Sequence, residues 1–247
     1  MDIDNKVSFP DLLGLSETDS EFVALFKQFA FQEVPKDLPF SLDERRYYLV
    51  TLAVLVGSQG LEAYKEILPV ALDNGVKAVE VKELLYQAVA YLGLSRVYAF
   101  FAPTNTIFTN QGMSLPLASQ KNTKNQTRLE AGEEAQIAIF GDQMKGFATK
   151  GEPDVRHINK WLVDNCFGDY YTRSSLDYAE RELLTFCYLY SQGGCEPQLK
   201  GHIAANLCLG NDKTLLIAVI SACIPYIGYP RTLNALSCIN EVANAQQ

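Results

Sequence analysis

The sequence predicts an all-α protein in which one chain carries two tandem copies of a helical unit. Three observations predict this fold class. Apolar residues recur at helical spacing, as Phe22, Phe26 and Phe29 do near the start of the chain. Helix-start signals precede such stretches, for example Ser41 followed three residues later by Glu44, which is a capping-box pattern. Finally, a pattern of residues in the first half returns in the second half.

Turn residues separate the helical stretches along the chain. The first stretch is expected to end at Pro35, and a second is expected from Ser41 to Gly57. Further helices are predicted at about 61–73, 79–92, 94–101 and 129–142. Residues 102–128 are polar and contain several turn-forming residues, so they are predicted to form an irregular connector.

The internal repeat gives the domain organisation. Ser41-Leu42-Asp43 returns as Ser175-Leu176-Asp177, at an offset of 134 residues. Beyond the turn at Gly193–Gly194, where an insertion is easily tolerated, the offset becomes 135. The pairs at this second offset are Gly75 with Gly210, Tyr91 with Tyr226 and Arg96 with Arg231. We therefore expect an N-terminal repeat at 1–101, a linker at 102–128 and a C-terminal repeat at 129–247.

Composition and charge narrow the classes of function. A chain of 247 residues with 48% hydrophobic content can bury a large core. Its formal charge of -8 argues against a nucleic-acid surface, because phosphate binding needs clustered Lys and Arg. The start, Met1–Asp4, lacks signal-peptide features, and no apolar run approaches about 20 residues. We expect a cytoplasmic protein whose partner is a small-molecule substrate, without nucleic acid or membrane.

The cysteines and histidines give no sign of a cofactor. The six cysteines all lie in the C-terminal portion, and a cytosolic chain of this size does not need disulfides. Those in apolar helical runs are predicted to be buried as small hydrophobes: Cys187, Cys208, Cys223 and Cys238. With only two histidines, His157 and His202, and no Cys-x-x-Cys pair, neither a metal site nor another cofactor is expected.

The stretch 182–231 has the highest density of reactive side chains. Its paired glycines, Gly193–Gly194, are suited to end one helix, and Pro197 is suited to start the next. Cys195 then lies at a helix N-terminus. The unpaired amides and the dipole there are expected to lower the pKa of its thiol.

One functional site per chain is expected, in the second copy. Gln198 and His202 are four residues apart and share a helix face. Glu182 comes from the preceding helix, which would fold back alongside. In the first copy, the positions of Glu182, Cys195 and His202 are taken by Tyr48, Gly60 and Ile67.

Three motifs of this region resemble the carboxymuconolactone decarboxylase family. They are Arg181-Glu182-Leu183-Leu184-Thr185, Gln198-Leu199-Lys200-Gly201-His202 and Tyr226-Ile227-Gly228-Tyr229-Pro230-Arg231. Upstream, Leu129-Glu130-Ala131-Gly132 and Phe167-Gly168-Asp169-Tyr170 add to the likeness. The resemblance covers 129–242, and 20–101 more weakly. It implies an alkylhydroperoxidase-D-like helical fold and assembly of the two-repeat chain into a homotrimer.

The same superfamily includes alkylhydroperoxidase-D-like proteins, whose motif is a Glu, then Cys-x-x-Cys, then a His. Here Cys195 takes the first cysteine position, but Gln198 takes the second. A dithiol relay needs a resolving cysteine beside the attacking one, and this sequence lacks it at that position.

The resemblance favours cofactor-independent proton transfer or decarboxylation on a small lactone or related carbonyl acid. His202 would be the general acid/base, and Glu182 would set its tautomer and favour its charged form. Arg231 would bind a substrate carboxylate. Gln198 and Tyr226 would complete the substrate site.

Two other functions stay open. In a thiol peroxidase of peroxiredoxin type, Cys195 would attack a peroxide. In a non-catalytic binding protein, the scaffold would hold a small molecule without turnover. Structural roles also compete: Glu182 would complement a helix dipole, Arg231 would bond to a helix end, and Tyr226 would pack in the core.

Overall fold

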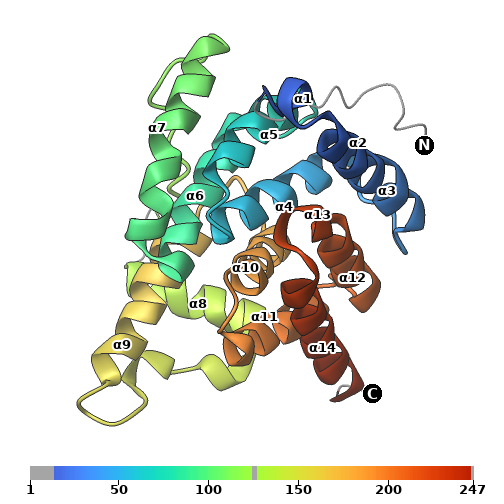
Figure 1. The fold of residues 1–247 in the computed structure, drawn as a ribbon. Coiled ribbons are helices and arrows are strands. Elements are labelled where there is room, and N and C mark those ends of the chain that lie inside the picture. Colours follow the sequence, from blue (N-terminus) through green and yellow to red (C-terminus); the bar gives the residue numbers. More distant parts are fainter. Residues whose placement is uncertain (1–13, 124–126, 246–247) are drawn as a thin grey trace.

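The structure, a computed structural model, describes residues 14–123 and 127–245. The parts of the expected repeats and linker at 1–13, 124–126 and 246–247 lie outside the described residues. Within the described ranges all regular elements are helical and no strand occurs (Figure 1). The predicted all-α class is confirmed.

The first half contains an N-terminal helical segment and then a set of four helices. In order, these are α1 (Leu15–Thr18), α2 (Ser20–Gln28), the π-helical turn η3 (Phe29–Glu33), α3 (Val34–Asp37), α4 (Glu44–Gly57), α5 (Leu61–Asp73), α6 (Ala78–Leu92) and α7 (Leu94–Asn110). Pro35 does not end the first helical stretch, contrary to expectation. It lies in the first turn of α3, where a missing amide donor is tolerated, and helix continues to Asp37.

The second half repeats this set after a short N-terminal module of its own. The elements are α8 (Arg128–Phe140), the 3₁₀ turns η4 (Asp142–Met144) and η5 (Phe147–Thr149), α9 (Arg156–Trp161), the π-helical η6 (Leu162–Tyr171), α10 (Tyr178–Gln192), α11 (Glu196–Cys208), α12 (Lys213–Ala222), α13 (Ile224–Ile227) and α14 (Tyr229–Ala245).

The four-helix sets follow the sequence repeat. α4 and α10 start 178 − 44 = 134 residues apart, whereas α5 and α11, α6 and α12, and α7 and α14 each start 135 apart. The additional residue lies in a different place from the one expected. The turns after α4 and α10 both span three residues, and α10 has 15 residues against 14 in α4, so the insertion lengthens the helix.

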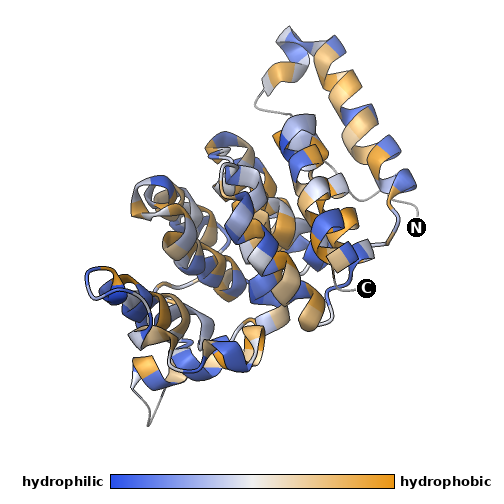
Figure 2. Ribbon diagram, turned by 90° about the horizontal axis from the view of Figure 1, so that it is seen from below, coloured by the Kyte–Doolittle hydropathy of each residue, from blue (hydrophilic) through white to orange (hydrophobic). Residues whose placement is uncertain are grey.

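The paired helices α4 and α10 form the centre of the molecule. Both are buried along most of their length, and they pack against each other. Their crossing is close, because a Cβ on Gly57 would lie 2.0 Å from Oγ of Ser191 and 3.1 Å from the carbonyl oxygen of Tyr188. The surrounding helices carry apolar and polar residues along their length (Figure 2), as expected for helices with one face on the core.

The connector begins later than predicted. α7 continues through Pro103 to Asn110, although residues 102–110 were expected to be irregular. Packing outweighs the helix-breaking effect of proline here. Phe100 and Phe108 are buried, and the hydroxyl of Thr104 donates to the carbonyl of Phe100, 2.7 Å away.

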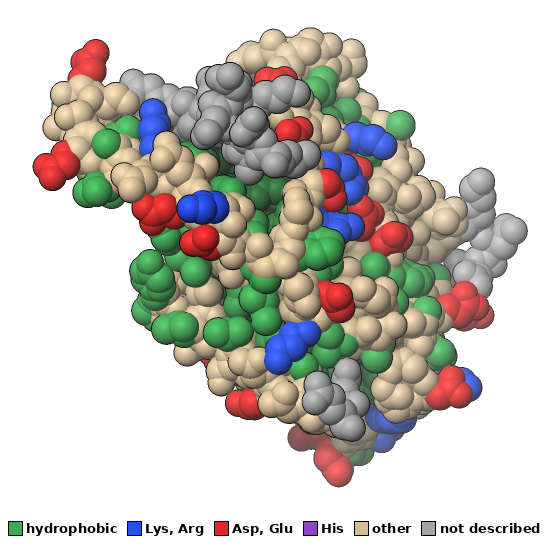
Figure 3. All heavy atoms as spheres, turned by 90° about the vertical axis from the view of Figure 1, so that its right-hand side faces the viewer, with side chains coloured by type: hydrophobic (Ala, Val, Ile, Leu, Met, Phe, Trp, Pro, Cys, Tyr) green, Lys and Arg blue, Asp and Glu red, His purple; other side chains and the backbone are tan. Residues whose placement is uncertain are grey.

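The surface mixes charge of both signs. On the face drawn in Figure 3, acidic and basic side chains are interspersed, with apolar side chains between them. Exposed apolar residues on α2 and α14 include Phe22 and Tyr229. Across 14–123 and 127–245, the helices are too short or too polar to cross a membrane.

Candidate functional site

The structure brings Glu182 and His202 into direct contact. A capping box of Asp177 and Glu180 starts α10, which places Glu182 in its second turn. α11 packs against α10 and carries His202 in its second turn. Nδ1 of His202 lies 2.6 Å from Oε2 of Glu182, and the carboxylate is fully buried while the imidazole is 14% exposed. Because an ionised carboxylate can only accept, Nδ1 carries the shared proton.

The carboxylate of Glu182 is held by a second donor. The Tyr171 hydroxyl donates to Oε1 of Glu182 at 2.8 Å, and it lies 2.7 Å from the hydroxyls of both Thr185 and Tyr91. Burial and, after it, the charge of Glu182 hold the pKa of Tyr171 well above its ordinary value. Tyr171 therefore stays protonated and remains a donor to the carboxylate near neutral pH.

Two aromatic rings enclose the imidazole of His202. Tyr91, from α6 of the first copy, has its ring centroid 5.4 Å away, and Phe140, from α8, has its centroid 5.6 Å away. Both rings meet the imidazole edge to face. Since Glu182 occupies Nδ1, Nε2 is the nitrogen left to exchange a proton with a ligand.

Asn206 fixes the two helices at this point. Its Nδ2 donates to the carbonyl of His202 at 2.8 Å and to the carbonyl of Glu182 at 3.0 Å. Its Oδ1 accepts from Nδ2 of Asn211 at 2.8 Å. The relative position of acid and imidazole is therefore set by a buried amide as well as by helix packing.

A buried hydrogen-bonded chain continues from this pair into the first copy. Thr185, already bonded to Tyr171, accepts from Nε2 of Gln87 at 2.9 Å. Oε1 of Gln87 accepts from Nη1 of Arg181 at 2.9 Å, and Nη2 of Arg181 lies 3.2 Å from Oε2 of Glu83. α6 thus contributes both an aromatic wall and polar support to a site whose acid and imidazole come from the second copy.

Cys195 has a different environment from the one predicted. Its thiol donates to the carbonyl of Leu189 at 3.3 Å and accepts from Nε2 of Gln192 at 3.6 Å. Burial raises the pKa of the Cys195 thiol, and the charge of Glu196 acts in the same direction. The predicted lowering of the thiol pKa is wrong, because desolvation outweighs the hydrogen bond from Gln192, and the Cys195 side chain makes no capping hydrogen bond to the amides of α11. Within the described residues, no hydrogen bond joins Cys195 to His202.

The other predicted substrate residues are spread around the fold. Gln198 is exposed on α11, one turn before His202. Nη1 of Arg231 donates to the carbonyl of Ser191, at the end of α10. Arg231 and Cys195 border a cavity of about 10 Å³, which has room for about one water molecule. Tyr226 packs against Phe26, with ring centroids 6.3 Å apart.

Tyr226 and Arg231 line a separate cavity of about 420 Å³ beside Gly60 and Ala63 of the first copy. Gly60 corresponds to Cys195 in the repeat. This cavity is therefore the first-copy counterpart of the region beside Cys195, on the helix that carries His202. Tyr226 of the second copy therefore reaches the first-copy side, and its repeat partner Tyr91 of the first copy reaches His202 in the second.

The sequence prediction missed the residues that come from the first copy. Tyr91 contacts His202, and Nη1 of Arg96 donates to Oε1 of Gln192 at 3.1 Å, next to Cys195. The repeat pairs Tyr91 with Tyr226 and Arg96 with Arg231, so the signal was present. The repeat did not indicate that Tyr91 and Arg96 lie at the site of the second copy, or that Tyr226 and Arg231 lie at the first-copy cavity. Neither Tyr171 nor Phe140 was assigned to the site from the sequence, although Phe140-Gly141-Asp142 belongs to the upstream run that resembles the family.

The remaining predicted cysteines agree with expectation except for one. Cys187, Cys223 and Cys238 are buried, but Cys208 at the end of α11 is exposed. None of the six forms a disulfide. In the described part of the chain, no group of three or more His, Cys, Asp and Glu side chains is placed to hold a metal ion.

Comparison with known protein families identifies both halves of the chain. The model of the carboxymuconolactone decarboxylase family matches residues 20–106 and, a second time, residues 157–241. The chain belongs to the carboxymuconolactone decarboxylase family. The first match includes α2–α6 and most of α7, and the second includes η6–α13 and most of α14, so each match covers one four-helix set and the helical segment before it.

A solved structure supports the fold of this family member. The crystal structure of a protein assigned as a gamma-carboxymuconolactone decarboxylase subunit, from Burkholderia xenovorans LB400, matches with a TM-score of 0.54. The match covers 96% of this chain and 92% of the other, at 17% sequence identity. At that identity the likeness concerns the fold. Among curated proteins, no match is found.

Proposed function

We propose that this carboxymuconolactone decarboxylase family member is an enzyme that moves a proton on a small lactone or related carbonyl acid, with His202 as general acid and base. One observation carries the proposal. The imidazole of His202 is bound through Nδ1 to the buried carboxylate of Glu182 at 2.6 Å, which leaves Nε2 free of that carboxylate, with the rings of Tyr91 and Phe140 beside the imidazole. This arrangement is that of an oriented acid/base.

The reaction can proceed without an electron sink other than the substrate. When the bond between a ring carbon and its carboxylate breaks, the electron pair passes into the conjugated lactone carbonyl and CO₂ leaves. The resulting enolate takes a proton at carbon from Nε2–H of His202, which is restored from solvent. Glu182 stabilises the imidazolium by its charge, and the aromatic walls exclude water.

Arg96 is the better candidate for a substrate carboxylate anchor. Arg231, the residue expected in this role, donates to the Ser191 carbonyl and lines the first-copy cavity. Arg96 is exposed and follows Tyr91 by five residues, at the start of α7. Its guanidinium donates to the neutral amide of Gln192, which a carboxylate can replace with a stronger charge-assisted bond.

The geometry gives the thiol peroxidase alternative less support. A peroxidatic cysteine acts as a thiolate, whereas burial raises the pKa of Cys195 and its thiol donates to the Leu189 carbonyl. Gln198, where a resolving cysteine would be needed, is an exposed amide.

The test is the turnover of carboxymuconolactone by the wild type and three variants. His202→Gln is expected to lower the rate by about 10²- to 10⁴-fold, which is the usual contribution of a positioned proton donor. Cys195→Ser should leave the rate within a few-fold. His157→Gln is the matched control, because it changes the only other histidine, which is exposed on α9.

Three results would overturn the proposal. Unchanged turnover in His202→Gln would remove His202 from the reaction. Loss of activity in Cys195→Ser with a peroxide as substrate would favour the thiol reaction. Binding of carboxymuconolactone without turnover by the wild type would indicate a non-catalytic binding protein.

A further inference from the structure

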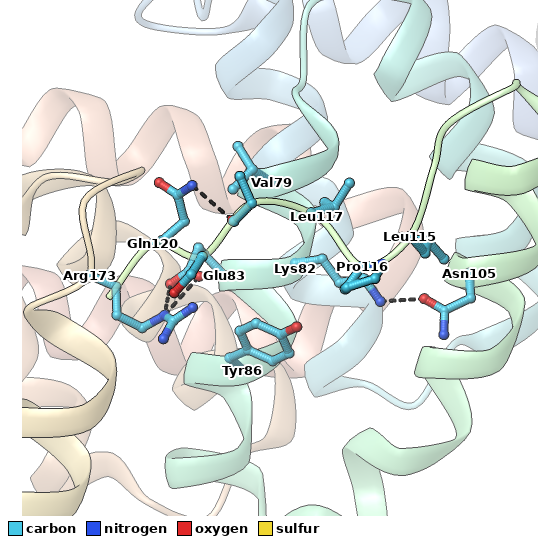
Figure 4. Close-up of a pocket in the computed structure, with 12 residues that line it drawn as sticks. Val79, Lys82, Glu83, Tyr86, Asn105, Leu115, Pro116, Leu117, Gln120 and Arg173 are labelled. Carbon is cyan, nitrogen blue, oxygen red and sulfur yellow. Dashed lines mark hydrogen bonds and ion pairs between the residues drawn. The ribbon is translucent and has the colours of Figure 1, made fainter. Parts of the chain in front are cut away.

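A third cavity lies along α6, and the proposed function does not use it. Its volume is about 520 Å³, within the range of small-molecule sites. α6 supplies Lys82, Glu83 and Tyr86, and the connector residues 115–120 cross in front (Figure 4). Arg173 closes one end, and the Lys82–Asn105 pair lies at the other (Figure 4).

Lys82 is a buried cation without a counterion. The residue is only 8% exposed, and its Nζ donates to Oδ1 of Asn105. Nζ also lies 5.7 Å from the ring centroids of both Phe101 and Phe108. Among the residues that the structure describes, Lys82 forms no ion pair. Desolvation lowers the pKa of its ammonium, as expected for a buried charge that lacks an anion.

The opposite end also carries more positive than negative charge. Nε of Arg173 lies 2.8 Å from both carboxylate oxygens of Glu83, and Nη2 of Arg181 lies 3.2 Å from the same carboxylate. Two guanidinium groups therefore share one carboxylate. The terminal nitrogens of Arg173 donate none of the hydrogen bonds found in the described residues, so they are available to a ligand.

We propose that this cavity is a binding site for a small dicarboxylate, with one carboxylate at Lys82 and Asn105 and the other at Arg173. The ligand class follows from the positive charge at both ends of the cavity. Among the lining residues, Lys82 and Arg173 are positively charged and Glu83 is the one carboxylate, and the buried Arg181 pairs with that same carboxylate. These four side chains together carry an excess of two positive charges.

The wall between the two charged ends fits the carbon body of such a ligand. Leu115, Pro116 and Leu117 of the connector lie on one side, and the ring of Tyr86 lies on the other (Figure 4). Tyr86 is held in place, since the guanidinium of Arg173 lies 5.4 Å from its ring centroid. A dicarboxylate with a short hydrocarbon chain therefore matches both the ends and the middle of the cavity.

The site is separate from the one around His202. None of the residues that line the cavity contacts the imidazole. On α6, Glu83 precedes Tyr91 by eight residues, about 12 Å along the helix. The inference does not rest on the proposed function, because binding here is measured without turnover.

Calorimetric titration of the full chain with adipate, a six-carbon dicarboxylate, tests the site. Hexanoate and 1,6-hexanediol are the matched ligands that lack one and both charges. We expect adipate to bind at least tenfold more tightly than hexanoate, and hexanediol to give no measurable binding. Lys82→Met should weaken adipate at least tenfold, because it removes one buried charge partner at nearly constant side-chain length.

Two control variants locate the binding. Lys121→Met removes the same charge from an exposed position one residue beyond the lining, and it should leave the affinity within twofold. His202→Gln should also leave it within twofold. As a measurement that needs no variant, adipate should protect Lys82 from acetylation by acetic anhydride, as read by mass spectrometry.

The proposal is overturned by any of four results. These are no binding of adipate to the wild type, equal binding of hexanediol, unchanged affinity in a folded Lys82→Met protein, or inorganic phosphate binding as tightly as adipate. The last result would indicate a site for a simple inorganic anion. If Lys82→Met does not fold, unchanged acetylation of Lys82 in the presence of adipate overturns it equally.

Discussion

The hydroxyl of Tyr171 donates to Glu182 at 2.8 Å, on the carboxylate oxygen that His202 leaves free. Both oxygens of this fully buried carboxylate are therefore hydrogen-bonded. A buried carboxylate needs such partners, since an unmet lone pair is costly away from water. Tyr171 supplies the donor for the oxygen of Glu182 that His202 does not contact.

Tyr171→Phe should therefore destabilise the protein and slow the reaction. Loss of the hydroxyl leaves Oε1 of Glu182 without this donor, and such a loss costs about 1–3 kcal/mol. Urea unfolding measures the stability. The adjacent Tyr170→Phe, at a half-exposed position, should change it by no more than about 0.5 kcal/mol. Equal effects of the two variants would show that the hydroxyl of Tyr171 has no special role.

Two glycine substitutions should have opposite signs. A Cβ on Gly132 of α8 would lie 2.0 Å from the carbonyl oxygen of Val163 in η6, so Gly132→Ala must push these elements apart and should cost at least about 1–3 kcal/mol. Gly201 in α11 has no atom within 4 Å of its Cβ position and no positive φ. Gly201→Ala should stabilise the protein by about 0.5–1 kcal/mol, because alanine favours a helix interior. Thermal or urea unfolding of both variants measures this, and a stabilised Gly132→Ala would contradict the close packing of α8 on η6.

Removing the charge of Glu83 should be strongly destabilising. Its side chain is 1% exposed and lies between Arg173 and Arg181. Glu83→Gln leaves a buried guanidinium uncompensated, which typically costs about 3–5 kcal/mol. Asp142→Asn is the control, since its ion pair with Lys145 is on the surface and should contribute no more than about 1 kcal/mol. If the two variants unfold at the same urea concentration, the buried pair does not stabilise the fold.

The pH dependence of Cys195 alkylation follows from its environment. The thiolate is the reacting form, and burial raises the pKa of Cys195 above the ordinary 9.0. The rate of reaction with iodoacetamide should therefore reach its half-maximum above pH 9. The measurement uses a Cys208→Ser background, because Cys208 is exposed and would also react. A half-maximal rate near pH 7 would contradict the raised pKa and revive the peroxidase reading.

Local pattern predicted the helices and the acid–imidazole pair, but not their neighbours. Spacing and capping residues place Glu182 and His202 on consecutive helices, and antiparallel packing then brings them together. Pro103 predicted the end of a helix, but α7 continues through it because buried side chains on both sides stabilise the helix. Local sequence does not indicate that burial. For Cys195 the helix terminus was correctly located, but the burial that decides its pKa is a tertiary property.

Tyr91 of the first copy lies at the His202 site, and Tyr226 of the second copy lies at the first-copy cavity. This arrangement depends on tertiary packing and not on local sequence. α4 and α10 cross closely at Gly57, so each central helix presents its site toward the other copy. As a result Tyr91 closes the His202 site, and Tyr226 closes the first-copy cavity. Assigning Tyr226 and Arg231 to the His202 site follows from treating each copy as self-contained, which the packing of α4 on α10 does not allow.

The most direct measurement of the acid–imidazole pair is a double-mutant cycle on carboxymuconolactone turnover. The variants are Glu182→Gln, His202→Gln and both together, with Glu62→Gln as an exposed control. If Glu182 acts through His202, Glu182→Gln should slow the wild type by more than tenfold but should change the His202→Gln enzyme by less than about threefold, as expected for coupled residues. Independent effects that multiply, or turnover that survives both changes, would contradict a catalytic pair at this site.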